Sequence, residues 1–175
     1  MPESGVRLRV VLFRHGPAEL RDPARWPRDE QRPLSAKGIV QTRRAARGLV
    51  RAAGPVDLVA TSAAVRARMT TEALAGALGT RVATEVWEEL AVGRLAGAIL
   101  ERLHALPRAR RSVVLVGHEP ALAELAGLAL VGDGVPIVKL AKAGAVLVEF
   151  PSAVAPGAAR LRWALTRKQL VALRS

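Results

Sequence analysis

Two of the three histidines in this chain follow apolar segments and stand beside glycine. His15 ends a solidly apolar run and lies between Arg14 and Gly16. His118 follows a second apolar segment and is preceded by a glycine. An imidazole can act as a nucleophile, an arginine supplies fixed positive charge, and a glycine lets a ligand approach the backbone closely. This pattern predicts a binding site for an anionic group at both positions.

More arginines follow a third apolar segment, which ends at residues 61–62. Arg66 and Arg68 lie four and six positions beyond it, on the expected first turn of a helix. Arginine binds phosphate oxygens through paired hydrogen bonds, and the amino end of a helix favours negative charge. The combination of imidazoles and guanidinium groups therefore predicts a phosphoryl group as the ligand.

The same residues argue against a metal site. Two histidines surrounded by arginines would repel a cation, and no trio of Asp, Glu or His has the spacing of metal ligands. We expect neither a metal nor another cofactor. A histidine at the end of a buried strand could also cap backbone carbonyls, but this alternative does not account for both His15 and His118 beside Arg14. His104 lies on a predicted helix and is expected to be an ordinary surface or boundary residue.

The composition favours one compact domain. The chain has 175 residues, of which 50% are hydrophobic, and no cysteine. This length allows one full hydrophobic core, so we expect residues 1–175 to form a single domain. The absence of cysteine excludes disulfides and thiolate chemistry. The amino terminus lacks the apolar core of a secretion signal, and no apolar run is long enough to span a bilayer. We therefore expect a cytoplasmic protein without a membrane segment.

The formal net charge of +12 raises the question of nucleic-acid binding. Basic surfaces attract phosphate backbones. However, the arginines are spread along the whole chain, as a compositional bias of the source genome would also produce. The densest clusters, at 43–51 and 108–111, lack the interleaved aromatic residues that stack on bases. We therefore expect no nucleic-acid partner, whereas acidic or phosphorylated partners fit the charge.

The elements that must position these residues alternate between strands and helices. Strands are predicted at 6–13, 57–62, 80–86, 112–119, 145–150 and 160–166, the last two as neighbours. Helices are predicted at 34–53, between 62 and about 78, at 95–106, and from Pro120 in its first turn to about 131. This alternation predicts a three-layer α/β sandwich with a largely parallel central sheet flanked by helices.

The local signals also place the site within that fold. Ser35 is the predicted N-cap of the first helix, and Gly54 its stop. The polar segment at 17–33 is too irregular for a helix, and loops of this length are often functional. In open α/β sheets, ligands bind outside the carboxyl ends of the strands. His15 and His118 each end a predicted strand, so we expect both at that edge.

Four sequence blocks in this order resemble the histidine phosphatase superfamily, whose members share an Arg-His-Gly signature. The blocks are LFRHG at 12–16, TSAAVRARMTTEAL at 61–74, EELAVG at 88–93 and VGHEP at 116–120. The short chain, the compact RPLSAKG segment at 32–38 and the absence of a helical insertion resemble the SixA-type phosphohistidine phosphatases. The resemblance covers nearly the whole chain and implies a phosphoglycerate mutase-like fold.

The resemblance implies that His15 attacks phosphorus and becomes a covalent phosphohistidine. It also implies that Arg14, Arg66 and His118 hold the phosphoryl oxygens. We expect Gly16 to let the phosphate come close. The matching position of Arg32 lies near the phosphate pocket of the family, with a solvated loop arginine as an equal alternative. Arg68 is expected on the surface.

The residue that donates a proton is less clearly marked. Glu89 matches the position of the proton donor in mutase-like members of the superfamily, and Glu19 is a more distant candidate. A solvated loop carboxylate at position 89, and a site without any acid, are the alternatives. Protonated imidazole is a good leaving group, so a site without a strong acid could still cleave phosphohistidine.

The chain also lacks the insertion with which larger relatives cover their pocket, which leaves an open rim. The open rim and a site that can work without a strong acid both favour phosphohistidine in proteins over sugar phosphates as the substrate, for example in a histidine phosphotransfer domain. The absence of a metal-ligand cluster predicts that this phosphatase is metal-independent. Two alternatives stay open. One is a small-molecule or nucleotide phosphatase or mutase of the same superfamily. The other is a module that binds a phosphorylated partner without catalysis.

Overall fold

A computed structural model describes residues 7–79 and 82–173. Within these ranges it contains a six-stranded sheet with the strand order β3-β2-β4-β1-β5-β6. The strands are β1 (Leu8–Arg14), β2 (Leu58–Thr61), β3 (Ala83–Val86), β4 (Ser112–Gly117), β5 (Ala145–Phe150) and β6 (Arg160–Leu165). Strands β1 to β4 run parallel to one another, whereas β5 is antiparallel to both β1 and β6. The expected largely parallel sheet is confirmed, as is the pairing of the last two strands.

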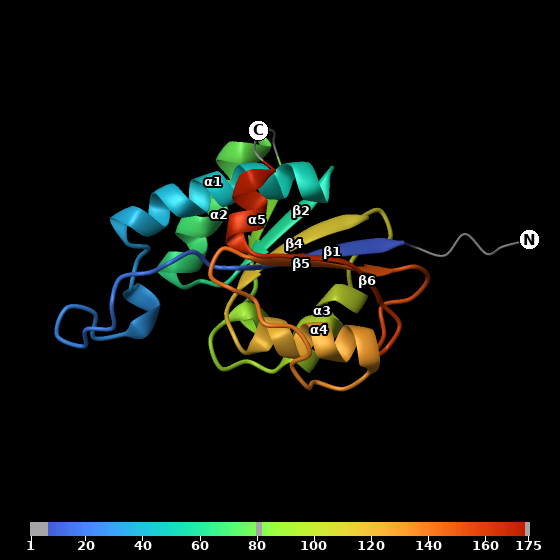
Figure 1. Ribbon diagram of the computed structural model, residues 1–175. Helices are drawn as coiled ribbons and strands as arrows, with labels where there is room; N and C mark the ends of the chain where they lie inside the picture. The colour runs from blue at the N-terminus through green and yellow to red at the C-terminus, as the bar shows by residue number, and fades with distance from the viewer. Residues whose placement is uncertain (1–6, 80–81, 174–175) are drawn as a thin grey trace, which may run out of the picture.

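Helices cover both faces of this sheet and complete three layers (Figure 1). One face carries α1 (Ala36–Ala53), α2 (Val65–Leu78) and α5 (Arg167–Ala172), and the other carries α3 (Ala96–His104) and α4 (Ala121–Val131). Two 3₁₀ turns, η1 (Asp29–Gln31) and η2 (Glu88–Leu90), lie in the connections. Within the described residues, no helix is long and apolar enough to cross a bilayer.

Alternation along the strands divides the core between the two faces. In β1, Val10 and Leu12 belong to the apolar cluster that includes residues of α3 and α4. Val11 and Phe13 belong to the cluster that includes residues of α1 and α2. Successive side chains of a strand point to opposite faces, so a strand covered on both sides becomes continuously apolar. This explains why the segment before Arg14 is uniformly hydrophobic, and it gives His15 a rigid base.

The caps of α1 agree with the sequence prediction. Ser35 Oγ accepts a hydrogen bond from the Gly38 backbone N–H at 3.0 Å, and the helix ends at Gly54, whose φ is 69°. A positive φ is readily adopted only by glycine, which accounts for the stop. The predicted boundaries elsewhere hold within a few residues. Pro120 lies directly before α4 instead of inside its first turn.

Two parts of the prediction differ from the structure or lie outside it. The strand predicted at 80–86 begins within the two undescribed residues, 80 and 81, and the described part is β3. The strand predicted at 160–166 ends one residue earlier, because Thr166 caps the unpredicted helix α5. Thr166 and Gln169 form a reciprocal capping box. The Thr-x-x-Gln spacing is a known signal for a helix start, so the sequence did contain this information.

Candidate active site

His15 directly follows β1 at the carboxyl edge of the parallel strands, and its side chain is buried. Its backbone N–H donates to the Gly117 carbonyl at 3.0 Å, which ties it to β4. His15 Nδ1 lies 2.7 Å from the Gly16 carbonyl oxygen. A carbonyl oxygen can only accept, so Nδ1 carries the hydrogen and Nε2 keeps its lone pair. The local backbone therefore fixes the tautomer in which Nε2 can attack an electrophile.

The surroundings of His15 also keep its ring neutral. Burial lowers the pKa of His15 to about 3. His118 and the positive charges of Arg66 and Arg14 act in the same direction. Removing a charged imidazole from water is costly, and neighbouring cations oppose its protonation. The nucleophilic, uncharged form of His15 therefore dominates at neutral pH.

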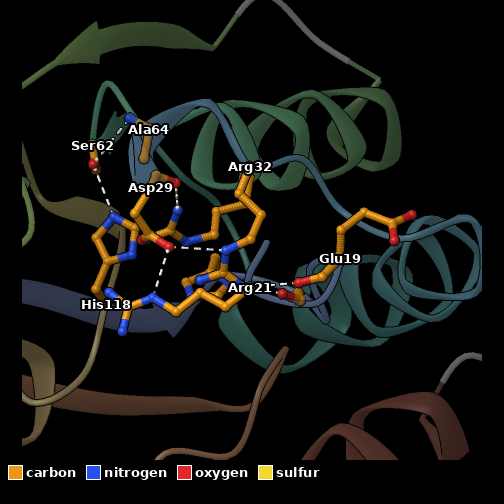
Figure 2. A network of polar contacts seen from close by, with 10 residues as sticks. Glu19, Arg21, Asp29, Arg32, Ser62, Ala64 and His118 are labelled. Atoms are coloured by element: carbon orange, nitrogen blue, oxygen red, sulfur yellow. Dashed lines mark hydrogen bonds and ion pairs between the residues drawn. The ribbon is translucent and has the colours of Figure 1, made fainter. Parts of the chain in front are cut away.

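His118 faces His15 across the site, with their ring centroids 5.0 Å apart. His118 Nε2 lies 2.9 Å from Ser62 Oγ, which accepts the Ala64 backbone N–H at 3.2 Å (Figure 2). The Ser62 hydroxyl hydrogen is thus available to His118 Nε2, and this favours the tautomer with hydrogen on Nδ1. Burial lowers the pKa of His118 to about 4, with Arg66 acting in the same direction. His118 Nδ1 is buried and has no hydrogen-bond partner within the described part of the chain.

Two arginines present further unpaired nitrogens. Arg66 lies in the first turn of α2, is buried, and donates from both terminal nitrogens to Asp29. Arg14 donates from NH1 to the Leu140 carbonyl at 2.8 Å. The Nε atoms of both arginines are buried without a partner among residues 7–79 and 82–173. An unsatisfied buried donor costs about 1–3 kcal/mol, so both nitrogens are available to donate to a bound oxyanion. That these arginines bind phosphate stays a prediction.

Asp29 organises the arginines and was missed by the sequence reasoning. Its Oδ2 accepts from Arg66 NH2 at 2.9 Å and its Oδ1 from Arg32 Nε at 3.0 Å, while Arg21 Nε lies 3.4 Å from Oδ1. Figure 2 shows this carboxylate among the arginine side chains beside His118. Burial raises the pKa of Asp29, but the Arg32 hydrogen bond and the Arg66 charge outweigh it and lower the pKa overall. Asp29 is therefore negatively charged and pairs with the Arg66 guanidinium group.

Arg32 lies near the site and is not a solvated loop residue. Its side chain is 17% exposed, and besides Asp29 it binds the Glu19 backbone carbonyl through NH1 at 2.9 Å. The spacing of Asp29 and Arg32 along the chain could have suggested their pairing. The contact between Asp29 and Arg66 spans 37 positions, and no local signal indicates it.

The comparisons with known proteins agree with this geometry. A family model described as the histidine phosphatase superfamily (branch 1) matches residues 10–112. This chain belongs to the histidine phosphatase superfamily. A relative from Picosynechococcus sp., itself an uncharacterised protein, is 37% identical over 143 residues, which cover 79% of this chain and 83% of the relative.

Solved structures extend the similarity to the whole fold of this histidine phosphatase. The protein histidine phosphatase SixA complexed with tungstate matches with a TM-score of 0.81 at 24% identity, covering 93% of this chain and 99% of that one. A structure assigned as phosphohistidine phosphatase SixA from Agrobacterium tumefaciens gives 0.74 at 24% identity, covering 91% and 97%. One from Nakamurella multipartitia, assigned likewise, gives 0.71 at 27% identity, covering 90% and 95%. The α/β fold is thus the phosphoglycerate mutase-like fold expected from the sequence.

Gly16 has a structural role in this histidine phosphatase that differs from the predicted one. A Cβ atom at this position would clash with Thr42 Oγ1 in α1. The Gly16 backbone N–H donates to Thr70 Oγ1 in α2 at 3.0 Å. The missing side chain thus lets the segment after β1 pack closely between two helices. Close approach of phosphate to Gly16 stays a prediction.

The remaining predicted residues do not converge on His15. Glu89 lies in η2 and is half-buried, and no hydrogen bond or ion pair described in the structure joins it to either site histidine. The Glu19 side chain points away from His118 (Figure 2). Arg68 is exposed, as expected. His104 ends α3, is exposed, and has its Nδ1 3.0 Å from the Val154 carbonyl oxygen.

One further carboxyl group in the VGHEP block was given no role. Glu119 follows His118 and is half-buried, and its Oε1 atom is buried without a partner among the described residues. Burial raises the pKa of Glu119, although Arg14 acts in the opposite direction. The described residues hold no group of three or more His, Cys, Asp or Glu that could bind a metal. Metal-independent activity stays a prediction.

Proposed function

We propose that this histidine phosphatase hydrolyses phosphoryl groups through a covalent phosphohistidine on His15, with phosphohistidine in proteins as its substrate. One observation carries the proposal. The buried, unpaired nitrogens of Arg14, Arg66 and His118 stand beside a neutral His15 whose Nε2 keeps its lone pair. Phosphoryl transfer needs an in-line nucleophile and fixed donors for the oxygens over which charge spreads.

The reaction follows in two transfers. His15 Nε2 forms a bond to phosphorus while the bond from phosphorus to the leaving nitrogen breaks, and the three donor groups hold the oxygens. The leaving imidazole takes a proton from solvent and departs as a neutral ring. Water then attacks the phosphohistidine, the bond between phosphorus and Nε2 breaks, and inorganic phosphate is released. One difficult step is thus replaced by two easier displacements, each of which has a good leaving group.

The rim of the site supports a protein substrate. Leu20 is 86% exposed in the loop after β1, Leu95 is 77% exposed directly before α3, and Ile137 is 47% exposed in the connection that precedes β5. These three segments all meet the carboxyl edge of the parallel strands. Exposed aliphatic side chains on the connections that form this edge are available for contact with another protein.

The similarity to SixA structures supports the same substrate class. The neighbour complexed with tungstate binds a tetrahedral oxyanion of the same shape and charge as phosphate. The alignment with that neighbour covers 93% of this chain and 99% of the neighbour. The two proteins therefore differ little in the length of their loops. A small-molecule phosphatase and a phosphate-binding module without catalysis are the competing functions.

The proposal is tested by trapping the intermediate. The protein reacts briefly with a labelled phosphohistidine peptide and is quenched in denaturant. We expect label on the protein that is stable in alkali and lost in acid, as for a phosphoramidate. His15→Ala should lose both label and turnover, because it removes the attacking nitrogen.

His104→Ala is the matched control, since it removes an exposed histidine at the end of α3 whose described hydrogen bond is to the Val154 carbonyl. It should retain both label and turnover. Label on another residue, or full activity in His15→Ala, would falsify the covalent mechanism. Phosphate binding without turnover in the unmodified protein would favour the binding module, and faster turnover of small phosphate esters than of the peptide would favour the small-molecule phosphatase.

A further inference from the structure

The outer face of α1 carries a line of basic side chains. Lys37, Val40, Arg44, Arg47 and Arg51 are all exposed and follow one another at spacings of three and four residues. Residues at these spacings lie on the same face of a helix. At a rise of about 1.5 Å per residue, the line is about 21 Å long. We call its four basic members the cationic stripe.

Helix α5 adds positive charge beside the stripe. It lies against α1 (Figure 1), and a Cβ atom at Gly48 of α1 would clash with the Leu170 backbone of α5. Helix α5 contributes Arg167 and Lys168, and neither α1 nor α5 contains an acidic residue, whereas α2, α3 and α4 each contain a glutamate. The chain holds 15 acidic residues against 27 basic ones, so its composition alone does not account for this uniform sign.

The charges of the stripe are unfavourable for the helix that carries them. Arg44, Arg47 and Arg51 are spaced three and four residues apart, and like charges at these spacings repel each other. Lys37 lies in the first turn, where the helix dipole disfavours a positive charge. Within the described part of the chain, no ion pair involves Lys37, Arg44 or Arg47. An anionic surface placed on the stripe would relieve this repulsion.

The stripe begins next to the segment that follows His15. The Ser35 backbone N–H, directly before α1, donates to the Pro17 carbonyl at 3.1 Å, and a Cβ atom at Gly38 would clash with the same carbonyl. Helix α1 therefore starts at the carboxyl edge of the parallel strands, where His15 lies, and runs away from it. A partner that lay along the stripe would reach the rim of the site with one end.

We propose that the cationic stripe binds an acidic helix of the phosphoprotein substrate and thereby brings its phosphohistidine to His15. The line of charges matches carboxylates that are spaced three and four residues apart on a partner helix. Val40, which is 48% exposed, offers the partner an apolar contact within the line. Neither α1 nor α5 has an aromatic residue on which nucleic-acid bases could stack. This inference rests on the proposed function and adds the surface by which the substrate is recognised.

The test uses a phosphohistidine peptide extended by a helical segment with glutamates at spacings of three and four residues. A second peptide carries glutamine at the same positions. At low salt we expect kcat/KM to be about 10-fold higher for the glutamate peptide, through a lower KM, because opposite charges speed the encounter. The difference should vanish at about 1 M salt, where the Debye length is about 3 Å.

Two double variants locate the effect on the surface. Arg44→Gln/Arg47→Gln removes the centre of the stripe and should give both peptides the same kcat/KM without lowering kcat. Arg160→Gln/Arg162→Gln is the matched control, because it removes two exposed arginines from β6 and should keep the preference for glutamate. The stripe variant should unfold at the same temperature as the unaltered protein or higher, since repulsion within α1 is relieved.

The outcomes separate this inference from the proposed function. Equal kcat/KM for the two peptides at low salt, or an unchanged preference in Arg44→Gln/Arg47→Gln, would overturn the docking surface while turnover of both peptides still supported the proposed function. Tighter binding through the stripe of duplex DNA, or of vesicles that contain an anionic lipid, would also overturn the acidic helix as its partner. Binding of the glutamate peptide through the stripe without turnover would overturn the proposed function and leave the docking surface in place.

Discussion

Arg66 and Arg68 have the same side chain and lie on the same turn of α2, yet only Arg66 reaches the site. Residues two positions apart on a helix point in nearly opposite directions. Arg66 is buried against Asp29, whereas Arg68 is exposed. The sequence named both as candidates, and the packing of α2 on the sheet selects one of them.

At the residue scale, we predict that Arg66→Ala lowers kcat by about 10²-fold or more, because it removes a charged donor that strengthens as negative charge develops on the phosphoryl oxygens. Arg68→Ala, two residues away and exposed, should stay close to the unaltered protein. Steady-state kinetics with circular dichroism to monitor folding would measure both. Near-normal turnover in Arg66→Ala would remove this residue from the mechanism.

At the element scale, the segment between β1 and α1 is a long connection held in place by its own contacts. Its two ends meet through a bridge between Ala18 and Leu34 and through the Glu19 N–H donating to the Pro33 carbonyl at 2.9 Å. Its middle is joined to α2 by Asp29. The irregular segment is thereby ordered through side-chain contacts instead of regular secondary structure.

We therefore predict that Asp29→Asn weakens the connection and misplaces Arg66. The variant keeps the backbone carbonyl that accepts from Arg66 NH1 but loses the negative charge that balances the arginines. We expect kcat to fall by about 10-fold, since a hydrogen bond to a charged group contributes on the order of 1.5–3 kcal/mol and the partly exposed Asp29 is expected at the lower end. We also expect faster proteolytic cleavage between residues 20 and 28.

Asp22→Asn is the matched control for this prediction. Asp22 lies in the same connection and only accepts the backbone N–H groups of Ala24 and Arg25. The Asp22→Asn substitution should leave kcat unchanged. If Asp29→Asn increased the affinity for tungstate without loss of kcat, then Asp29 would compete with the ligand and would not position Arg66.

At the scale of the whole molecule, the two buried histidines link stability to pH. The pKa of His15 is lowered to about 3 and that of His118 to about 4, from 6.5 in the unfolded chain. Below pH 6.5 the unfolded chain therefore binds protons that the folded protein does not, and this lowers the free energy of unfolding. The contribution to stability is complete above pH 6.5 and is lost progressively as the pH falls toward 4.

We predict that His118→Asn reduces this dependence, because it removes one of the two groups. Urea unfolding at pH 7 and pH 5 should show a smaller loss of stability in the variant than in the unaltered protein. Between pH 7 and pH 8 the two curves should run in parallel. An equal loss on acidification would show that His118 is not neutral in the folded protein.

Much of the fold and the centre of the site followed from local patterns. The apolar runs before His15 and His118 marked buried parallel strands, and the polar or glycine residues at their ends marked the edge where ligands bind. Capping signals placed α1, since its N-cap is Ser35 and its C-cap is Gly54, as predicted. Helix α5 could have been found by the same means from its capping box.

The sequence by itself determined the strand ends, with Arg14 and His15 at one and His118 at another, because these depend on hydrophobic spacing and on residues adjacent in the chain. Only the tertiary structure decided that Asp29 pairs with Arg66, that Gly16 fits against Thr42, and that the half-buried Glu119 lies within the field of Arg14. Each of those contacts joins elements that are distant along the chain or depends on how a helix packs on the sheet. The energy of such contacts comes from burial and charge in the assembled protein, and no local pattern encodes it.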